Sequence, residues 1–420
     1  MSNQKKQWGA IIVMIALFAM IAFVTNLCTP MATIIKNQGE ISNLLAQIGN
    51  YGNFVAYLVM GIPAGMLISK FGYKKTALIG LAVGATGIMI QWVSGLLDVE
   101  QNLGLVFTVY LIGAFIAGLC MCILNCVVNP MLNLLGGGGN SGNQLIQIGG
   151  VFNSSAAVAC YILMGALIAD ATKAKIADAT PALMIALAIF VIAFIVISFT
   201  KIEEPEQAPV ELSLIKGAMS YSHFALGALA IFLYMGIEVG VPNFVQQYLI
   251  ADGIPAGTVG MLVAVYWFMM LIGRFVGASI GSKVSSRAMI TTVSIATLAL
   301  VLFGMYAPTD IIVSFPGVDW GKLELIWQDI PVGIFSFLLV GLCTSVIWGA
   351  IFNMAVEGLG KYTAIASGIF MTMVFGCAVM MAIQAAVADA TDYITSFWVV
   401  VFCAAYLLFY ALVGSKPTKK

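Results

Sequence analysis

Long apolar stretches, separated by short connections, run through this chain from near its start to near its end. The first of them, from Trp8 to about Ile35, already exceeds the roughly 20 residues that a helix needs to cross a bilayer. Only 9% of the 420 residues are charged, whereas soluble domains average about 25%. Because so few charges cannot cover a surface that faces water, the sequence predicts an all-helical integral membrane protein embedded in a lipid bilayer.

Glycine, proline and charged residues divide the apolar stretches into twelve predicted transmembrane helices. These spans cover approximately residues 8–35, 41–69, 75–97, 102–135, 144–169, 181–200, 219–250, 256–283, 288–307, 330–356, 362–388 and 393–414. The connection 201–217 stands out because it carries four acids and two prolines. We therefore predict an N-terminal six-helix bundle at 1–200, a cytoplasmic linker at 201–217 and a C-terminal six-helix bundle at 218–420. The longest connection on the opposite side, 308–329, is expected to be a loop.

Lysine and arginine gather at one end of the predicted spans. Thirteen of the 18 lie on the side of the two termini, four lie on the other side, and Arg274 is near the inner end of span eight. Positively charged loops stay in the cytoplasm, so both termini are predicted to be cytoplasmic in a multi-pass inner-membrane protein. The 18 acids balance the 18 bases, which argues against a nucleic-acid partner.

A weak internal repeat relates residues 61–75 to residues 273–287, at a displacement of 212 residues. Two parallel six-span repeats with a site at their interface are typical of the major facilitator architecture. The basic residues of these segments are expected to form a cytoplasmic latch that pairs with helix ends or acids. They are Lys70, Lys74, Lys75, Arg274, Lys283 and Arg287. The alternative, that they only set the orientation, applies equally to all of them except Arg274.

Glu238 is the one carboxylate placed near the middle of a predicted span. Charged groups inside a bilayer cost several kcal/mol and usually have a function. Glu238 is therefore the candidate to bind a hydroxylated substrate, a cation or a proton. The structural alternative is that it pairs with a polar neighbour and holds span seven in place. Pro242 in the same span is expected to break the helical hydrogen-bond ladder and to produce a bend suited to a gate.

Uncharged polar side chains accompany Glu238 deep in several spans. Amides and hydroxyls suit a neutral polar ligand, because they donate and accept hydrogen bonds without a buried charge. An aromatic ring beside them suits the apolar face of a sugar. The predicted substrate-binding residues are Asn26, Thr29, Asn125, Asn129, Asn153, Glu238, Asn243, Gln246, Tyr266 and Trp348. For each amide or hydroxyl, the alternative is a plain interhelical hydrogen bond.

Neither enzyme chemistry nor a cofactor or metal site is predicted. His223 is the only histidine, so a Ser-His-Asp arrangement has a single base at the edge of span seven. The glycine run at 136–139 lacks the trailing Lys-Ser/Thr of a phosphate-binding loop.

Several strings resemble those of the fucose/proton symporter family of the major facilitator superfamily, over nearly the whole chain. They are Asn129-Pro130 with Leu134-Leu135-Gly136, Val151-Phe152-Asn153-Ser154, residues 232–240, Gly273-Arg274 with Gly277, Ile351-Phe352 and residues 358–361. The resemblance implies alternating access around a central cavity and transport of monosaccharides such as fucose, glucose or galactose, often coupled to protons or sodium.

The chain departs from the fucose branch of this family at three positions. Thr29 and Asn125 stand where that branch carries acids, and Gly150 stands where it carries a glutamine. The proton-coupling acids of that branch are thus absent, and Glu238 resembles the span-seven glutamate of glucose/galactose members.

The sequence as a whole predicts a secondary active transporter of a hexose or related sugar, with cation coupling through Glu238. Coupling through sodium, or no coupling, is left open by the missing acids. The alternatives are a facilitator, an exporter of another small polar or amphipathic solute, and a transporter-like sensor that binds without moving its ligand.

Overall fold

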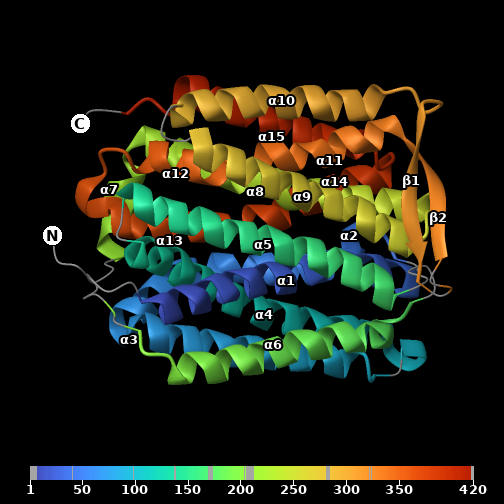
Figure 1. Ribbon diagram of the computed structural model, residues 1–420, viewed down its shortest axis with the longest axis horizontal. Coiled ribbons are helices and arrows are strands. Elements are labelled where there is room, and N and C mark those ends of the chain that lie inside the picture. Colours follow the sequence, from blue (N-terminus) through green and yellow to red (C-terminus); the bar gives the residue numbers. More distant parts are fainter. Residues whose placement is uncertain are drawn as a thin grey trace.

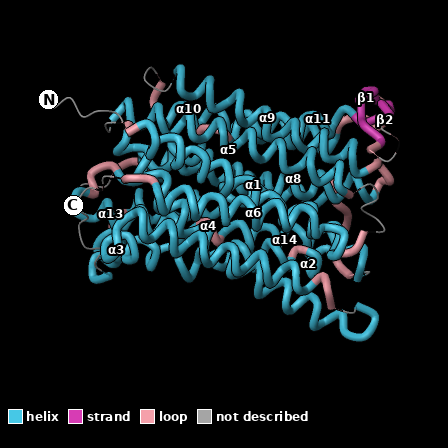
Figure 2. Tube along the Cα trace, turned by 60° about the horizontal axis from the view of Figure 1, so that its bottom comes forward, coloured by secondary structure: helices cyan, strands magenta, loops and turns pink. Residues whose placement is uncertain are grey.

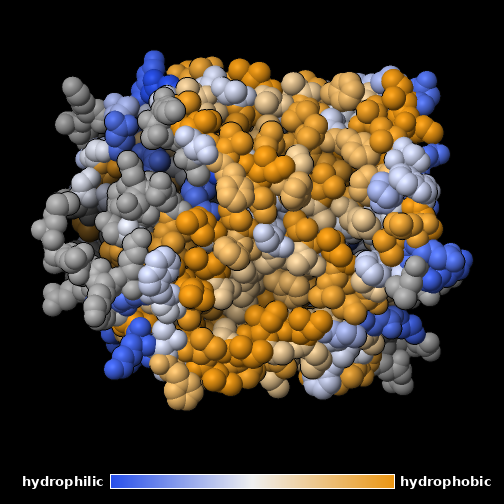
Figure 3. All heavy atoms as spheres, in the orientation of Figure 1, coloured by the Kyte–Doolittle hydropathy of each residue, from blue (hydrophilic) through white to orange (hydrophobic). Residues whose placement is uncertain are grey.

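The computed structural model describes residues 7–39, 41–97, 99–136, 139–168, 174–202, 204, 212–280, 284–320, 322 and 324–417. Its long helices run in roughly one direction, with a β-hairpin at one end and the two ends of the chain at the other (Figure 1). We call these the hairpin end and the termini end. Apolar residues form a broad belt between two polar ends (Figure 3), which is the surface expected of a protein that spans a bilayer.

We use first half for the helices up to residue 199 and second half for those from residue 212 onward. The first half contains α1 (Trp8–Gly39), α2 (Asn43–Ala46), α3 (Ile48–Ser94), α4 (Val99–Leu135), α5 (Gly139–Leu167) and α6 (Thr180–Phe199). The second half begins with α7 (Ile215–Met219), α8 (Ser222–Ala251), α9 (Ala256–Ile280) and α10 (Ser286–Tyr306). It continues with α11 (Val332–Thr344), α12 (Ile347–Val356), α13 (Thr363–Met373), α14 (Gly376–Ala390) and α15 (Trp398–Phe409), which ends in a π-helical turn at Tyr410–Gly414.

Helix α3 contains two membrane crossings, because it reverses at Gly72. Gly52 and Gly87 both pack against the segment of α4 between Leu111 and Ala117, although a straight helix would separate them by about 52 Å. Gly72 has φ 79°, a left-handed conformation that only glycine adopts easily. Eleven helical segments within the described residues are long and apolar enough to cross a membrane, and the second crossing of α3 brings the number to twelve.

The carboxylate of Glu204 stabilises this reversal. It accepts hydrogen bonds from the backbone N–H groups of Tyr73 and Lys74, at 2.7 and 2.8 Å. Those N–H groups belong to the first turn after Gly72, where a helix has unpaired donors and favours a negative charge. The acid of the linker therefore caps the second crossing of α3.

Spans ten and eleven are interrupted, whereas the sequence predicted each of them as one uninterrupted span. The first is divided at Ser345–Val346, between α11 and α12, and the second at Val374–Phe375, between α13 and α14. At the first break the Tyr234 hydroxyl donates to the carbonyl of Thr344 at 3.1 Å. A carbonyl that leaves a helix inside a bilayer needs such a partner, and α8 supplies it.

The expected gap in the hydrogen-bond ladder lies inside a continuous helix, because α8 runs from Ser222 to Ala251 with Pro242 within it. A proline lacks the N–H that would bond to the carbonyl four residues earlier, which here belongs to Glu238. The hydroxyl of Tyr266 on α9 donates to that carbonyl at 2.9 Å. The bond that α8 cannot make internally is thus supplied by its neighbour.

The predicted loop at 308–329 contains a two-stranded antiparallel sheet, β1 (Ile312–Asp319) and β2 (Glu324–Pro331). The hairpin packs on the ends of α9 and α11 (Figure 2). Its apolar and polar residues alternate in part, which is the pattern of a strand with one covered face. Leu325 and Trp327 remain exposed on β2.

The two halves meet along two pairs of helices, α5 with α9 and α3 with α13. Glycines permit close approach within the second half as well: a Cβ added at Gly376 would lie 2.6 Å from the Cα of Phe232 on α8. Real atoms do not approach so closely, so the packing of α14 against α8 depends on a residue without a side chain at position 376.

We therefore expect Gly376→Val to destabilise the protein by about 1–3 kcal/mol, because the added atoms force α14 away from α8. The measurement is the unfolding temperature of the purified protein in detergent. Gly349→Ala is the control, since a Cβ there meets nothing within 4 Å. Equal unfolding temperatures for the two variants would contradict this account of the packing.

Candidate functional site

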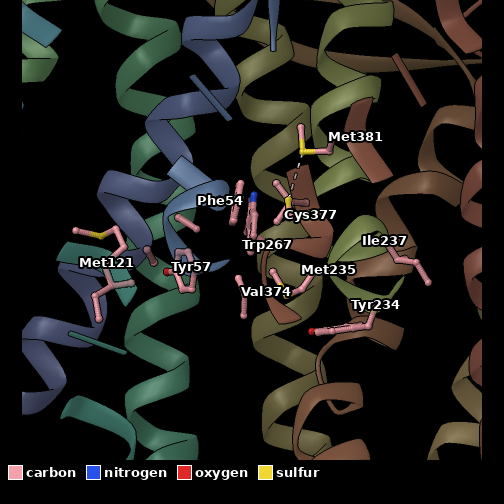
Figure 4. Close-up of a cluster of buried hydrophobic side chains, with 14 of the residues drawn as sticks. Phe54, Tyr57, Met121, Tyr234, Met235, Ile237, Trp267, Val374, Cys377 and Met381 are labelled. Carbon is pink, nitrogen blue, oxygen red and sulfur yellow. Dashed lines mark hydrogen bonds between the residues drawn. The ribbon is translucent and has the colours of Figure 1, made fainter. Parts of the chain in front are cut away.

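Buried hydrophobic side chains from both halves lie between the helices of the bundle (Figure 4). The first half contributes Phe54 and Tyr57 of α3, whose ring centroids are 6.1 Å apart. The second half contributes Trp267 of α9 and Tyr234 of α8. Aromatic rings and methionine side chains thus form the walls of the contact between the halves.

Glu238 and Arg274 form a charged centre within these walls. Both side chains are partly buried, and the guanidinium of Arg274 acts electrostatically on the Glu238 carboxylate. Tyr234 lies one turn before Glu238 on α8, and its hydroxyl acts on the same carboxylate. The Glu238 carboxylate therefore lies near Arg274 and Tyr234. Its backbone carbonyl accepts a hydrogen bond from the Tyr266 hydroxyl.

Arg274 also reaches the other half of the molecule. Its guanidinium donates to the carbonyl of Gly150 and, at 3.3 Å, to the side-chain oxygen of Asn153, both on α5. A Cβ at Gly150 would lie 3.2 Å from the Arg274 guanidinium. The space that a glutamine would fill in the resembled family is thus filled by an arginine from the second half.

Nearer the hairpin end, four buried amides form what we call the amide cluster: Gln47, Asn50, Asn243 and Gln247. Gln47 and Asn243 exchange two hydrogen bonds across the halves, at 2.8 and 3.1 Å. Asn50 donates to Gln47 and Gln247 donates to Asn243, each at 2.5 Å. The four side chains are at most 2% exposed, so this is a polar network inside the bundle.

Two threonines of α1 extend the amide cluster. Asn243 donates to the Thr29 hydroxyl at 3.4 Å, and Gln246 donates to that of Thr33 at 3.5 Å. Thr29, Asn243 and Gln246 of the predicted set therefore lie together, on helices from different halves.

The remaining predicted amides lie on the first-half side of the centre. Asn125 donates to the hydroxyl of Tyr57 at 3.0 Å, and Asn129 donates to the backbone of Asn125 at 3.2 Å. Asn153 donates to the carbonyl of Phe18 at 2.8 Å. Asn26 is buried and its amide turns back to the carbonyl of Ala22 on its own helix.

The two predicted aromatic residues differ in their surroundings. Tyr266 is fully buried, and its hydroxyl lies between the carbonyl of Glu238 and the hydroxyl of Thr344. Trp348 is partly buried and lies against Tyr234, with ring centroids 6.5 Å apart. In this state Tyr266 positions the backbone of α8, while Trp348 keeps part of its surface accessible.

At the hairpin end a second group of contacts closes the two halves together. The carboxylate of Asp389 on α14 accepts from the backbone N–H groups of Asn43 and Leu44, at 2.8 and 2.9 Å. Lys36 donates to the hydroxyl of Tyr393, and that hydroxyl donates to the side chain of Asn43 at 2.6 Å. An acid of the second half thus caps the first turn of α2 in the first half.

The predicted latch residues differ in their surroundings. Lys70 sits over the ring of Phe71, and Lys74 donates to the carbonyls of Ser198 and Thr200 at the end of α6. Lys75 and Arg287 are exposed, Arg274 lies in the charged centre, and Lys283 is outside the described residues.

Sequence reasoning did not select Gln47, Asn50, Asp389 or Tyr393. A signal was present for the first two, because Gln47, Asn50 and Asn53 repeat every three residues in an apolar span and fall on one face of a helix. Asp389 and Tyr393 lie at the end of a span, where polar residues are common.

We expect Asp389→Ala to loosen the hairpin end, because two charge-assisted hydrogen bonds between the halves are lost. The reporter is Thr33→Cys, at a position that is 3% exposed in this structure. Its reaction with a maleimide in purified protein should accelerate by about 3- to 10-fold. Seven of the eight native cysteines are buried, so their background reaction is small.

Asp392→Ala is the matched control. Hydrogen bonds from the side chain and backbone of Thr395 hold the pKa of the Asp392 carboxyl below its usual range. That contact lies within the second half, so its loss should leave the labelling rate of Thr33→Cys unchanged. Equal acceleration in both variants would refute a specific role for Asp389.

Comparison with known proteins gives consistent matches over almost the whole chain. A model of the Major Facilitator Superfamily matches residues 11–379. A glucose/galactose transporter of Brucella abortus is 28% identical, with 99% of this chain and 96% of the relative covered. An L-fucose-proton symporter of Escherichia coli is 20% identical, covering 94% and 91% of the two chains.

Two solved structures share the fold. The major facilitator transporter FucP in the outward conformation has a TM-score of 0.69 at 20% identity, covering 96% of this chain and 97% of that one. A D-xylose-proton symporter has a TM-score of 0.70 at 11% identity, covering 97% and 98%.

Proposed function

Because the chain belongs to the major facilitator superfamily, we propose that it carries a monosaccharide across the cytoplasmic membrane by alternating access. The relatives named as glucose/galactose transporters and fucose symporters support a sugar as the substrate class. The helix bundles at 1–200 and 218–420 would tilt against each other around a site between them.

The observation that carries this proposal is the chemistry of the contact between the halves. Amides of both halves bond to each other, and an amide of the first half bonds to the hydroxyl of a stacked aromatic ring. A sugar has an apolar face that packs on a ring and hydroxyls that bond to amides, so this combination suits it. The predicted residues Asn125, Asn129, Asn153, Asn243 and Trp348 would meet the substrate as the halves tilt.

We further propose that Glu238 couples sugar movement to a cation, either a proton or sodium. It is a carboxylate at mid-membrane whose neighbours include an arginine that contacts the opposite half. A change in the charge of Glu238 alters how strongly Arg274 is held on its own side, and hence its contact with α5. Thr29 and Asn125 carry no charge, so coupling would rest on this one acid.

Glu238→Gln is expected to abolish accumulation of sugar against a gradient and to leave equilibration of the sugar intact. The amide keeps the shape of the side chain but carries no negative charge and does not take up a proton. The measurement is uptake of a panel of labelled monosaccharides into proteoliposomes, with proton or sodium gradients imposed separately. Loss of accumulation should exceed about tenfold, the effect of roughly 1.4 kcal/mol.

Glu357→Gln, which changes an acid at the end of α12, serves as the control for a nonspecific charge effect. Accumulation by Glu238→Gln equal to that of the unmodified protein would refute the coupling role. Equilibration without accumulation in the unmodified protein would identify a facilitator. Binding without movement would identify a sensor.

The hairpin should face the outside of the membrane and both termini the cytoplasm, as the distribution of basic residues favours. Leu325→Cys places a thiol on β2 at a position that is 74% exposed. An impermeant maleimide should label it in intact cells, whereas Ser415→Cys, 1% exposed at the termini end, should react only after the membrane is opened and the protein denatured. Labelling of Leu325→Cys only in broken cells would show that the hairpin faces the cytoplasm, which contradicts this prediction.

A further inference from the structure

We propose that the amide cluster is a binding station for sugar hydroxyls, on the hairpin side of the Glu238 centre. Ligand hydroxyls there would replace the amide–amide hydrogen bonds that close this end of the molecule. The inference rests on the proposed function, since it assigns a first contact point for the same substrate.

The cluster must open whenever the hairpin end opens. Gln47 belongs to the first half and Asn243 to the second, and their two reciprocal hydrogen bonds span the contact. Separation of the halves at this end therefore breaks both bonds at once. The freed amides then face the entry path and offer both donors and acceptors to whatever enters.

The chemistry of the cluster selects a neutral ligand that donates hydrogen bonds. The four residues of the cluster carry no charge, and their neighbours Thr29 and Thr33 are hydroxyls. In the cluster and its neighbour Gln246, three acceptors have no partner among the described residues: the side-chain oxygens of Asn50, Gln246 and Gln247. These residues are buried, and an unpaired buried acceptor costs about 1–3 kcal/mol.

Asn53, three residues after Asn50 on α3, adds a buried donor without a partner, its side-chain N–H2. Three acceptors and one donor match a group of hydroxyls, because a hydroxyl both donates and accepts. They do not match an anion, which needs several donors. A polyhydroxylated neutral solute is therefore the class of ligand that fits.

The helix that carries Asn50 continues toward the centre with suitable side chains. Asn50, Phe54 and Tyr57 follow at intervals of four and three residues and so lie on one face of α3. Phe54 and Tyr57 are stacked, and the hydroxyl of Tyr57 accepts from Asn125. A sugar that leaves the amides would meet the rings of Phe54 and Tyr57 (Figure 4) and then the amide of Asn125.

Gln247→Met tests the station, because methionine has similar length but offers no amide. Uptake is measured for the transported sugar and for each of its monodeoxy analogues, in the unmodified protein and in the variant. We expect KM for the parent sugar to rise by about 3- to 10-fold, the effect of one lost hydrogen bond. We also expect that, for one deoxy analogue, the ratio of its KM to that of the parent sugar falls to about one in the variant. The hydroxyl that this analogue lacks would no longer have a protein partner in Gln247→Met.

If the amide cluster only holds the two halves together and never contacts the sugar, the result is different. In that case the labelling rate of Thr33→Cys changes in Gln247→Met, while every ratio between sugar and deoxy analogue stays at its original value. That outcome overturns the proposal. Asn50→Ser, which removes a different unpaired acceptor, is carried through the same comparison if Gln247→Met does not yield folded protein, and unchanged ratios there overturn it equally.

Gln91→Met is the matched control, because Gln91 is a buried amide that lies against Gly113 inside the first half. The ratios between parent sugar and deoxy analogues in Gln91→Met should equal those of the unmodified protein. If the unmodified protein moves no monosaccharide, the proposed function fails. If it moves one and Gln247→Met keeps all of its ratios, only the binding station fails.

Discussion

In a bilayer every backbone hydrogen-bonding group has to find a partner inside the protein. Pro242 withholds an N–H in the middle of α8, and the carbonyl of Glu238 is satisfied by Tyr266 on α9 instead. The break between α11 and α12 exposes the carbonyl of Thr344, and Tyr234 on α8 donates to it. These two exchanges tie three helices of the second half together around the one mid-membrane carboxylate.

The same requirement shapes the contact between the halves. Arg274 is bonded to the carbonyl of Gly150 and to Asn153, and Gln47 is bonded to Asn243. Each bond stabilises the present state and must be replaced when the halves separate. Groups that are satisfied across a moving contact need a substitute partner in the other state, and water or a hydroxylated solute provides it. Transport and stability therefore draw on the same side chains.

The twelve-span major facilitator architecture was predicted and is confirmed. It was predictable because hydropathy, positive charge and the family strings depend on residues that are neighbours in the sequence. The interruptions near Ser345 and Val374 were not predictable in this way, since no proline marks them and tertiary contacts with α8 stabilise them. The strands at 312–331 were missed although their alternation was visible. The hydrogen bond missing at Pro242 was predictable but its replacement was not, because Tyr266 lies 28 residues beyond Glu238 along the chain.

The candidate site shows the same division. Asn243 and Glu238 were singled out because they are polar residues in an apolar span, and their roles stay predictions. Gln47 was overlooked, because its significance depends on Asn243, 196 residues away. The replacement of a glutamine by Gly150 could be read from the sequence, whereas the position of Arg274 beside that glycine could not. Local patterns identify which residues are unusual, whereas only the fold identifies what they face.

The β-hairpin has a practical consequence for observing this protein. It packs on α9 and α11, which belong to one half, and it projects Leu325 and Trp327 outward at the end of the bundle. An antibody fragment bound there would therefore tilt with that half. At 44.5 kDa the molecule offers little mass beyond the lipid for electron microscopy, and such a fragment would supply a visible marker whose angle reports the state of the transport cycle.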